Sequence, residues 1–129
     1  MRRITKLATV TAVAATVAMA APLAAVAGSS DVTRTGNCSG PSDWKLKVGP
    51  ENGRLEVEYE VDQNRNGDRW RVRLRHNGQL AFAGQRTTHA PSGSFEVRIV
   101  EPNRPGTDAF RGTATNLRTG ERCVGTVSF

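Results

Sequence analysis

The stretches LEVEYEV, residues 55–61, and RWRVRLR, residues 69–75, decide the fold class of this chain. In both, apolar and charged residues alternate with a period of two, the period at which side chains switch faces along a β-strand. Each stretch therefore has one apolar face and one charged face. We predict two strands that each bury one face against a core.

The same alternation continues along the chain, and no segment has a sustained period of 3.6 residues. The predicted strands cover residues 44–48, 55–61, 69–75, 80–87, 95–99, 110–114 and 123–129. Turn-forming residues separate them, among them Asn77-Gly78, a hairpin signal of the type I′ kind. Seven short strands in about 100 residues indicate an all-β sandwich. Its predicted core contains Trp44, Leu46, Leu55, Val57, Tyr59, Trp70, Val72, Leu74, Phe95, Val97, Ile99, Phe110 and Val127.

The first 27 residues have the pattern of a secretory signal peptide. A basic start with Arg2, Arg3 and Lys6 precedes an uncharged run that ends in the small-residue sequence Ala25-Val26-Ala27. This run is rich in Ala and Thr and is interrupted by Pro22, so it is a weak candidate for a membrane anchor. We expect export of the protein to the extracellular space without a stable membrane anchor.

The leader divides the chain into three predicted regions. Residues 1–27 are a cleaved signal peptide, residues 28–36 a flexible tail, and residues 37–129 a single β-sandwich domain. The leader also holds three of the 18 basic residues, which leaves 15 against 12 acidic residues and a net charge of +3 instead of +6. That is an ordinary surface charge, so nucleic acid is not the expected partner.

Cys38 and Cys123 are the only cysteines in the sequence. An even number of cysteines in an exported chain predicts disulfide bonds, and two cysteines allow one pairing. Two are too few for a structural zinc site, and a separation of 85 positions is unlike a redox Cys-x-x-Cys motif. The predicted bond joins the start of the first predicted strand to the start of the last, which favours parallel neighbours, as in immunoglobulin-like sandwiches.

Three stretches resemble a family of small exported actinobacterial proteins of unknown function. They are VDQNRNGDRWRVRLRHNG, residues 61–78, TTHAPSGSFEV, residues 87–97, and ATNLRTGERC, residues 114–123. The resemblance implies a seven-stranded immunoglobulin-like β-sandwich, and the central Trp70 of the third predicted strand fits the buried tryptophan of such folds. The resemblance implies no activity and no site residues.

The charged faces of the second and third predicted strands allow two interpretations. If the strands form a hairpin with Asp62 opposite Arg69, the Glu row at 56, 58 and 60 meets the Arg row at 71, 73 and 75, and the charges neutralise each other. If the strands lie in opposite sheets, the Arg row becomes a positive stripe, joined by Arg86, Arg111 and Arg122. Such a stripe would attract an anionic polymer. Its candidate ligand-binding residues are Arg69, Arg71, Arg73 and Arg75.

A second candidate site follows the second predicted strand. Asp62, Asn64, Asn66 and Asp68, with Gly67, match the opening of a calcium-binding loop. The position that would supply a bidentate Glu holds Arg73, and Arg65 and Arg69 would oppose a cation. The alternative is an ordinary connection built from turn-forming residues. Calcium is therefore a minor hypothesis, and no other cofactor is expected.

The sequence has no nucleophile motif of a hydrolase, and a domain of this size leaves little room for a deep cleft. The predicted function is that of a secreted, monomeric, non-catalytic binding module, with the basic strand face directed toward an anionic cell-wall polymer. An exported protein inhibitor or toxin-like protein is the alternative, acting through the loops at 62–68, 88–93 and 101–107. A small extracellular hydrolase is the third alternative, with the Glu row as paired carboxylates.

Overall fold

The computed structural model of the chain describes residues 12, 14 and 30–129. The predicted signal peptide therefore lies outside the described residues, apart from these two single positions. The described part contains eight strands: β1 (Val32–Asn37), β2 (Asp43–Glu51), β3 (Arg54–Asp62), β4 (Arg69–His76), β5 (Gln79–Thr87), β6 (Ser94–Pro102), β7 (Ala109–Asn116) and β8 (Arg122–Ser128).

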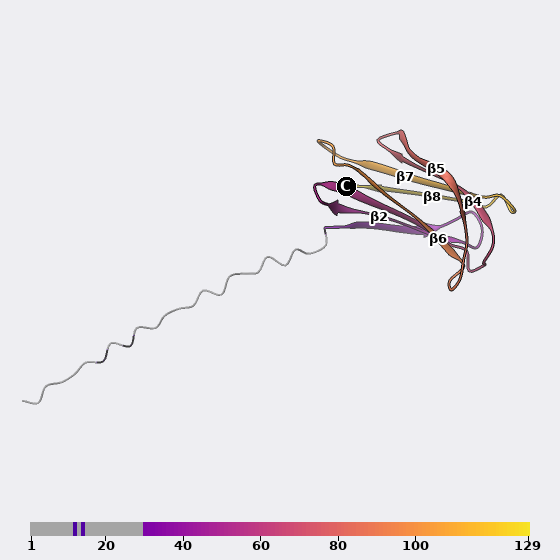
Figure 1. Ribbon diagram of the computed structural model, residues 1–129, viewed down its shortest axis with the longest axis horizontal. Helices are drawn as coiled ribbons and strands as arrows, with labels where there is room; N and C mark the ends of the chain where they lie inside the picture. Colours follow the sequence, from indigo (N-terminus) through magenta and orange to yellow (C-terminus); the bar gives the residue numbers. More distant parts are fainter. Residues whose placement is uncertain (1–11, 13, 15–29) are drawn as a thin grey trace, which may run out of the picture.

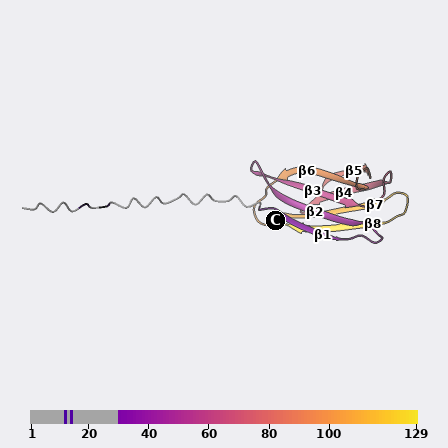
Figure 2. The same cartoon turned by 90° about the horizontal axis from the view of Figure 1, so that it is seen from below.

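The strands form two antiparallel sheets that pack face to face (Figures 1 and 2). One sheet has the order β1-β2-β3-β6, and the other has the order β5-β4-β7-β8. The start of β1 and the C terminus lie at the same end of the sandwich (Figure 1). The predicted all-β sandwich is confirmed. No helix in the described part is long and apolar enough to cross a membrane.

The core fills the space between the two sheets, because every strand of the alternating pattern directs its apolar row inward. Trp70 and Phe95 meet there from opposite sheets with their ring centroids 5.9 Å apart. Most of the predicted core residues are fully buried, whereas Trp44 and Ile99 are partly buried at its margin. The buried apolar residues that the prediction left out are Val48, Val61, Ala114 and Cys123.

The sandwich has eight strands instead of the predicted seven, because residues 32–37 form β1. The expectation of a flexible tail over residues 28–36 is therefore wrong for residues 32–36, which pair with β2 through the backbone. Most side chains of β1 are exposed, so its sequence lacks the alternation that marks the other strands. Gly36 is needed there, because a Cβ atom at this position would lie 2.7 Å from the Trp44 ring.

Of the two interpretations of the Glu and Arg rows, the hairpin is wrong. β3 is hydrogen-bonded to β2 on one edge and to β6 on the other, over nine residue pairs each, so neither edge is free for β4. β4 lies in the facing sheet between β5 and β7. This arrangement buries the apolar rows of both strands against each other, which side-by-side pairing in one sheet would not achieve.

The disulfide bond between Cys38 and Cys123 is present. It connects the turn after β1 to β8, and these strands belong to different sheets. The first and last predicted strands, residues 44–48 and 123–129, correspond to β2 and β8, which lie in different sheets, so the expectation that they are parallel neighbours is wrong. The bond instead ties the two sheets together, and two hydrogen bonds of 2.8 Å between Ser39 and Arg122 support this connection.

Candidate functional site

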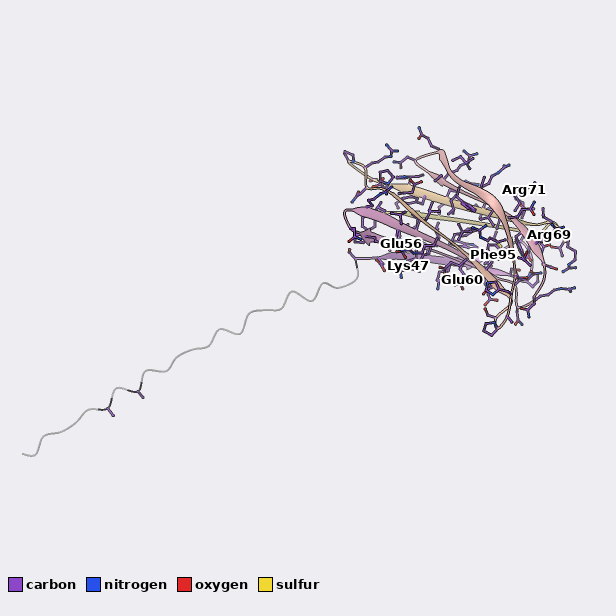
Figure 3. The ribbon with its side chains drawn as sticks, viewed as in Figure 1. Lys47, Glu56, Glu60, Arg69, Arg71 and Phe95 are labelled. Atoms are coloured by element: carbon purple, nitrogen blue, oxygen red, sulfur yellow. A yellow bond between two sulfur atoms is a disulfide. The ribbon has the colours of Figure 1, made fainter. Side chains whose placement is uncertain are left out.

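The outward side of the β5-β4-β7-β8 sheet carries a group of arginines, which we call the arginine face. Its members are Arg69, Arg71, Arg73 and Arg75 from β4, Arg111 from β7 and Arg122 from β8. All of them are exposed, because they occupy the alternate positions of strands whose other positions fill the core. Arg75 and Arg111 are direct cross-strand partners. The hypothesis that the Arg row and the Glu row lie on opposite sides of the domain is confirmed, and Figure 3 shows Arg69 and Arg71 across the sandwich from Glu56 and Glu60.

The arginine face has no acidic neighbours. All 12 Asp and Glu residues of the sequence lie within residues 30–129, and none occupies an outward position of β5, β4, β7 or β8. No ion pair among the described residues involves an arginine of this face. The only side-chain hydrogen bond that these arginines make in the described part joins Arg75 Nη1 to the Gly78 carbonyl at 3.2 Å. The guanidinium groups are therefore open to an external anion.

On the outward side of the other sheet, by contrast, basic and acidic side chains form ion pairs. Lys45 lies 3.7 Å from Glu60, and Lys47 lies 3.6 Å from Glu58. Arg98 pairs with Glu56 and also with Glu51, the latter at 2.8 Å. The hydrogen bond from Arg98 lowers the pKa of Glu56 to about 2. Much of the charge on this sheet is therefore paired, although Glu60 and Glu96 are cross-strand partners of like charge, whereas the arginine face has no ion pairs in the described part.

A shallow groove crosses the arginine face between β4 and β5. Arg71 and Arg73 line it on one side, and Ala83 and Gln85 line it on the other, around a volume of about 280 Å³. The groove exists because Ala83, the cross-strand partner of Arg73, has a short side chain. A ligand in this groove would contact two guanidinium groups on one side and the uncharged side chains of Ala83 and Gln85 on the other.

Two of the three further arginines predicted for the stripe belong to it. Arg111 and Arg122 lie on the arginine face, at outward positions of β7 and β8. Arg86 does not, because its partner in β4 is the inward-facing Trp70. Its guanidinium group lies 5.0 Å from the centroid of the Phe82 ring, at the sheet edge. An inward-directed charge on an edge strand discourages pairing with another chain.

In the loop proposed for calcium, the carboxylates of Asp62 and Asp68 both accept hydrogen bonds from other groups of the protein. Asp68 is buried, and its oxygens accept hydrogen bonds from the side chains of Gln63, Asn116 and Arg118. Asp62 Oδ1 accepts a hydrogen bond from the backbone N–H of Asn64 at 3.0 Å, which closes a local turn.

The remaining calcium candidate, Asn66, lies exposed in the same loop. In the described part, no group of three or more His, Cys, Asp or Glu side chains is arranged to hold a metal ion. Calcium binding by this loop therefore stays a prediction without support from the geometry.

The three predicted binding loops lie at two ends of the sandwich. The loops at 62–68 and 88–93 meet, since Gln63 N–H donates to the Gly93 carbonyl and Gly67 N–H to the Thr88 carbonyl. The loop at 101–107 lies at the opposite end, because β6 runs antiparallel to β3 and Pro102 pairs with Arg54. A partner protein that bound one end of the sandwich would therefore not contact all three loops.

A buried polar pair escaped the sequence analysis. His76 Nε2 lies 2.6 Å from Asp108 Oδ1, both side chains are buried, and the His76 ring stacks on Phe110. The backbone N–H of Ala109 donates to the Asn77 side chain beside this pair. These contacts join the β4–β5 turn to the start of β7. The two residues are 32 positions apart, so no local motif could reveal them.

Comparisons with protein-family models, with curated proteins and with solved structures gave no match for this chain.

Proposed function

We propose that this protein is a secreted, non-catalytic module that binds an anionic cell-wall polymer on its arginine face. The observation that supports this proposal is the set of six exposed arginines on one sheet face without an acidic neighbour. A folded domain gains nothing in stability from like charges held side by side. The opposite sheet carries paired charges, so the same chain has the means to neutralise a face.

The proposed ligand is a polymer with repeated phosphate groups. Every basic residue of the arginine face is arginine, while Lys45 and Lys47 both lie in the other sheet. The planar guanidinium group binds phosphate oxygens through two parallel hydrogen bonds, which a lysine ammonium group does not offer. Side chains two positions apart on β4 are spaced by roughly 6.7 Å, so an extended chain can contact several of them in sequence. Several weak contacts along one polymer add up to a useful affinity.

Single-stranded nucleic acid is a poorer fit to this face. Binding of single strands normally uses aromatic rings on which the bases stack. All seven aromatic residues of the sequence lie in the described part, and none occupies an outward position of the arginine face. The leader sequence also directs the expected site of action outside the cell. Both features support a wall polymer as the ligand.

The proposal includes an immunoglobulin-like fold, in which a sandwich displays a binding surface on one sheet. The sheet order β5-β4-β7-β8 against β2-β3-β6, with β1 added at the edge, supports this assignment. Trp70 is buried on the central strand β4, as is typical of such folds.

The test is retention of the exported protein on immobilised poly(glycerol phosphate) at physiological salt. Exchange of Arg71→Glu together with Arg73→Glu should abolish retention. The matched control is Arg54→Glu with Arg104→Glu, which makes the same charge change at exposed arginines outside the arginine face and should leave most of the retention.

Salt dependence gives a second readout. For the unmodified protein, the logarithm of the affinity should fall linearly with the logarithm of the salt concentration, with a slope that becomes shallower by roughly 0.7–0.9 for each arginine contact removed. Equal loss of retention in both double variants would refute the arginine face as the binding surface. Tighter retention on single-stranded DNA than on poly(glycerol phosphate) would refute the wall polymer as ligand. Capture of one stoichiometric protein partner from culture medium would instead favour the inhibitor hypothesis.

A further inference from the structure

A polar depression lies at the disulfide-bonded end of the sandwich, and no arginine of the arginine face lines it. Its volume is about 480 Å³, within the range of small-molecule sites. Three chain segments line it: the β1–β2 turn, the β3–β4 loop and the β7–β8 turn. The lining includes Ser39, Arg65, Arg118, Thr119, Gly120 and Glu121.

Arg118 is held in this depression by two hydrogen bonds to one carboxylate. Its Nε and Nη2 atoms donate to the two oxygens of Asp68 at 2.9 and 2.7 Å. Asp68 is 6% exposed and also accepts hydrogen bonds from Gln63 Nε2 and Asn116 Nδ2. Trp70 Nε1 donates in turn to Gln63 Oε1 at 3.1 Å. A buried carboxylate with this many partners holds the guanidinium plane in one orientation.

The part of the Arg118 guanidinium group that does not contact Asp68 can bind a ligand. About half of its side chain is exposed, and its Nη1 atom has no hydrogen-bond partner among the described residues. Arg65 adds a second guanidinium group, which is 61% exposed and lies 3.7 Å from Asp68. The backbones of Gly93 and Arg65 lie close together, because a Cβ atom at Gly93 would lie 2.2 Å from Arg65 N. The depression thus presents two guanidinium groups to solvent, of which Arg118 is held in place by Asp68.

Hydroxyl and carboxylate groups complete the lining. The Ser39 hydroxyl accepts a hydrogen bond from Arg122 N–H, and the Thr119 hydroxyl accepts one from Glu121 N–H, so both hydroxyl hydrogens remain to be donated. Glu121 is 9% exposed, and its oxygens accept from the backbone and the hydroxyl of Ser42. Its remaining lone pairs suit a ligand hydroxyl and oppose a bare anion. The lining therefore matches a molecule that carries one oxyanion and several hydroxyl groups.

We propose that this depression binds a small hydroxylated acid, a sugar carrying a carboxylate or phosphate group. The oxyanion contacts Arg118 and Arg65, and the hydroxyl groups of the sugar contact Glu121 and Ser39. The site is independent of the proposed polymer binding, because no arginine of the arginine face lines it.

The test is an NMR titration of the ¹⁵N-labelled exported protein with glucose 1-phosphate, glucuronate and glucose. The Arg118 Nε–H signal and the Thr119 and Gly120 amide signals should shift and saturate at millimolar concentrations with either acid, and glucose should leave them in place. A larger response to one acid identifies the oxyanion. Shifts that stay linear with concentration, or equal shifts with glucose, would overturn the proposal.

Variants separate this site from the rest of the surface. Arg65→Gln should weaken binding about tenfold, the expected effect of losing a charge-assisted hydrogen bond, without a change in melting temperature. Arg104→Gln, an exposed arginine at the other end, is the matched control and should bind normally. The Arg71→Glu, Arg73→Glu variant should bind the sugar acid normally while failing to bind the polymer. Unchanged sugar-acid affinity in Arg65→Gln would overturn the assignment.

Discussion

The replacement Arg111→Thr tests whether the arginine face is maintained at the expense of stability. Arg111 lies directly opposite Arg75 on β4, and its outward neighbours along β7 include Thr113. Threonine at 111 would continue a row of β-branched side chains and would remove one charge from the repulsive pair. We therefore expect a more stable protein that binds the polymer less well.

The size of the gain follows from the cross-strand geometry. Side chains directly opposite each other have Cβ atoms about 4.5–5.5 Å apart, and such a pair changes stability by roughly 0.2–1 kcal/mol. For a domain of about 100 residues this corresponds to an increase in melting temperature of about 1–5 °C. Because salt screens only the charge repulsion, the increase should be larger at about 10 mM salt, where charges interact over about 30 Å, than at about 1 M salt, where the screening length is about 3 Å.

Thermal melts followed by circular dichroism at both salt concentrations measure this gain. The matched control is Arg98→Thr on the opposite sheet, which removes the partner of Glu51 and Glu56 and should lower the melting temperature at low salt. The affinity for poly(glycerol phosphate) should fall in Arg111→Thr and stay unchanged in Arg98→Thr. A lower melting temperature in Arg111→Thr, or a gain of equal size at both salt concentrations, would refute the argument that binding determines the arginine at 111.

Three further predictions concern the interior and the sheet connection. Replacing Cys38 and Cys123 by serine should lower the free energy of unfolding by about 2–4 kcal/mol in urea titrations, because the bond closes a loop of 85 residues; an unchanged midpoint would contradict this. Burial raises the pKa of Tyr59, whose hydroxyl donates to the Cys123 carbonyl at 3.0 Å, so its contribution is complete below about pH 10 and is lost as the pH rises toward the folded-state pKa. Tyr59→Phe should lose about 1 kcal/mol at neutral pH and flatten the alkaline decline of stability, and an equally steep decline would count against it. Arg118 holds the pKa of Asp68 well below its usual range, so this carboxylate stabilises the fold above about pH 4 and loses that effect as the pH falls toward the folded-state pKa. Asp68→Asn should therefore destabilise the protein at pH 7 and weaken the acid dependence measured by urea titrations between about pH 2 and pH 7.

The alternation of residues predicted the strands and their buried faces because it depends only on neighbouring positions. Val57 and Val72 were assigned to the core in this way and are fully buried. Alternation does not identify the strand that pairs with each edge, so the partner of β4 stayed open between two hypotheses. β1 was missed because backbone hydrogen bonds to β2 hold it in place and few of its side chains are buried.

The candidate sites show a similar division between local and distant information. The Arg row of β4 is visible in seven consecutive residues, 69–75, and the structure places it on one exposed face. Asp68 was assigned to a calcium loop because the local spacing of oxygen-bearing residues matches such a loop. Its actual partner, Arg118, is 50 positions away in the chain, and only the folded arrangement of β4 and β7 brings them together. Local sequence therefore predicts which face is charged, and the fold decides which charges are already paired.

The contrast between the two sheets is the strongest argument that the arginine face has a function. Each sheet has alternating strands with charged outward positions, so the sheet pattern by itself requires no particular sign of charge. In one sheet Glu58 and Lys47 lie on neighbouring strands and pair at 3.6 Å, which also favours the correct register. In the other, Arg75 faces Arg111, an arrangement that favours neither register nor stability. Like charges also lie opposite each other in the first sheet, at Glu60 and Glu96, but there Lys45 lies 3.7 Å from Glu60. No ion pair in the described part involves Arg75 or Arg111. A face of unpaired charges of one sign is expected where binding, not folding, determines the residues. An external polyanion would supply the negative charge that this face lacks, so ligand binding should raise the melting temperature.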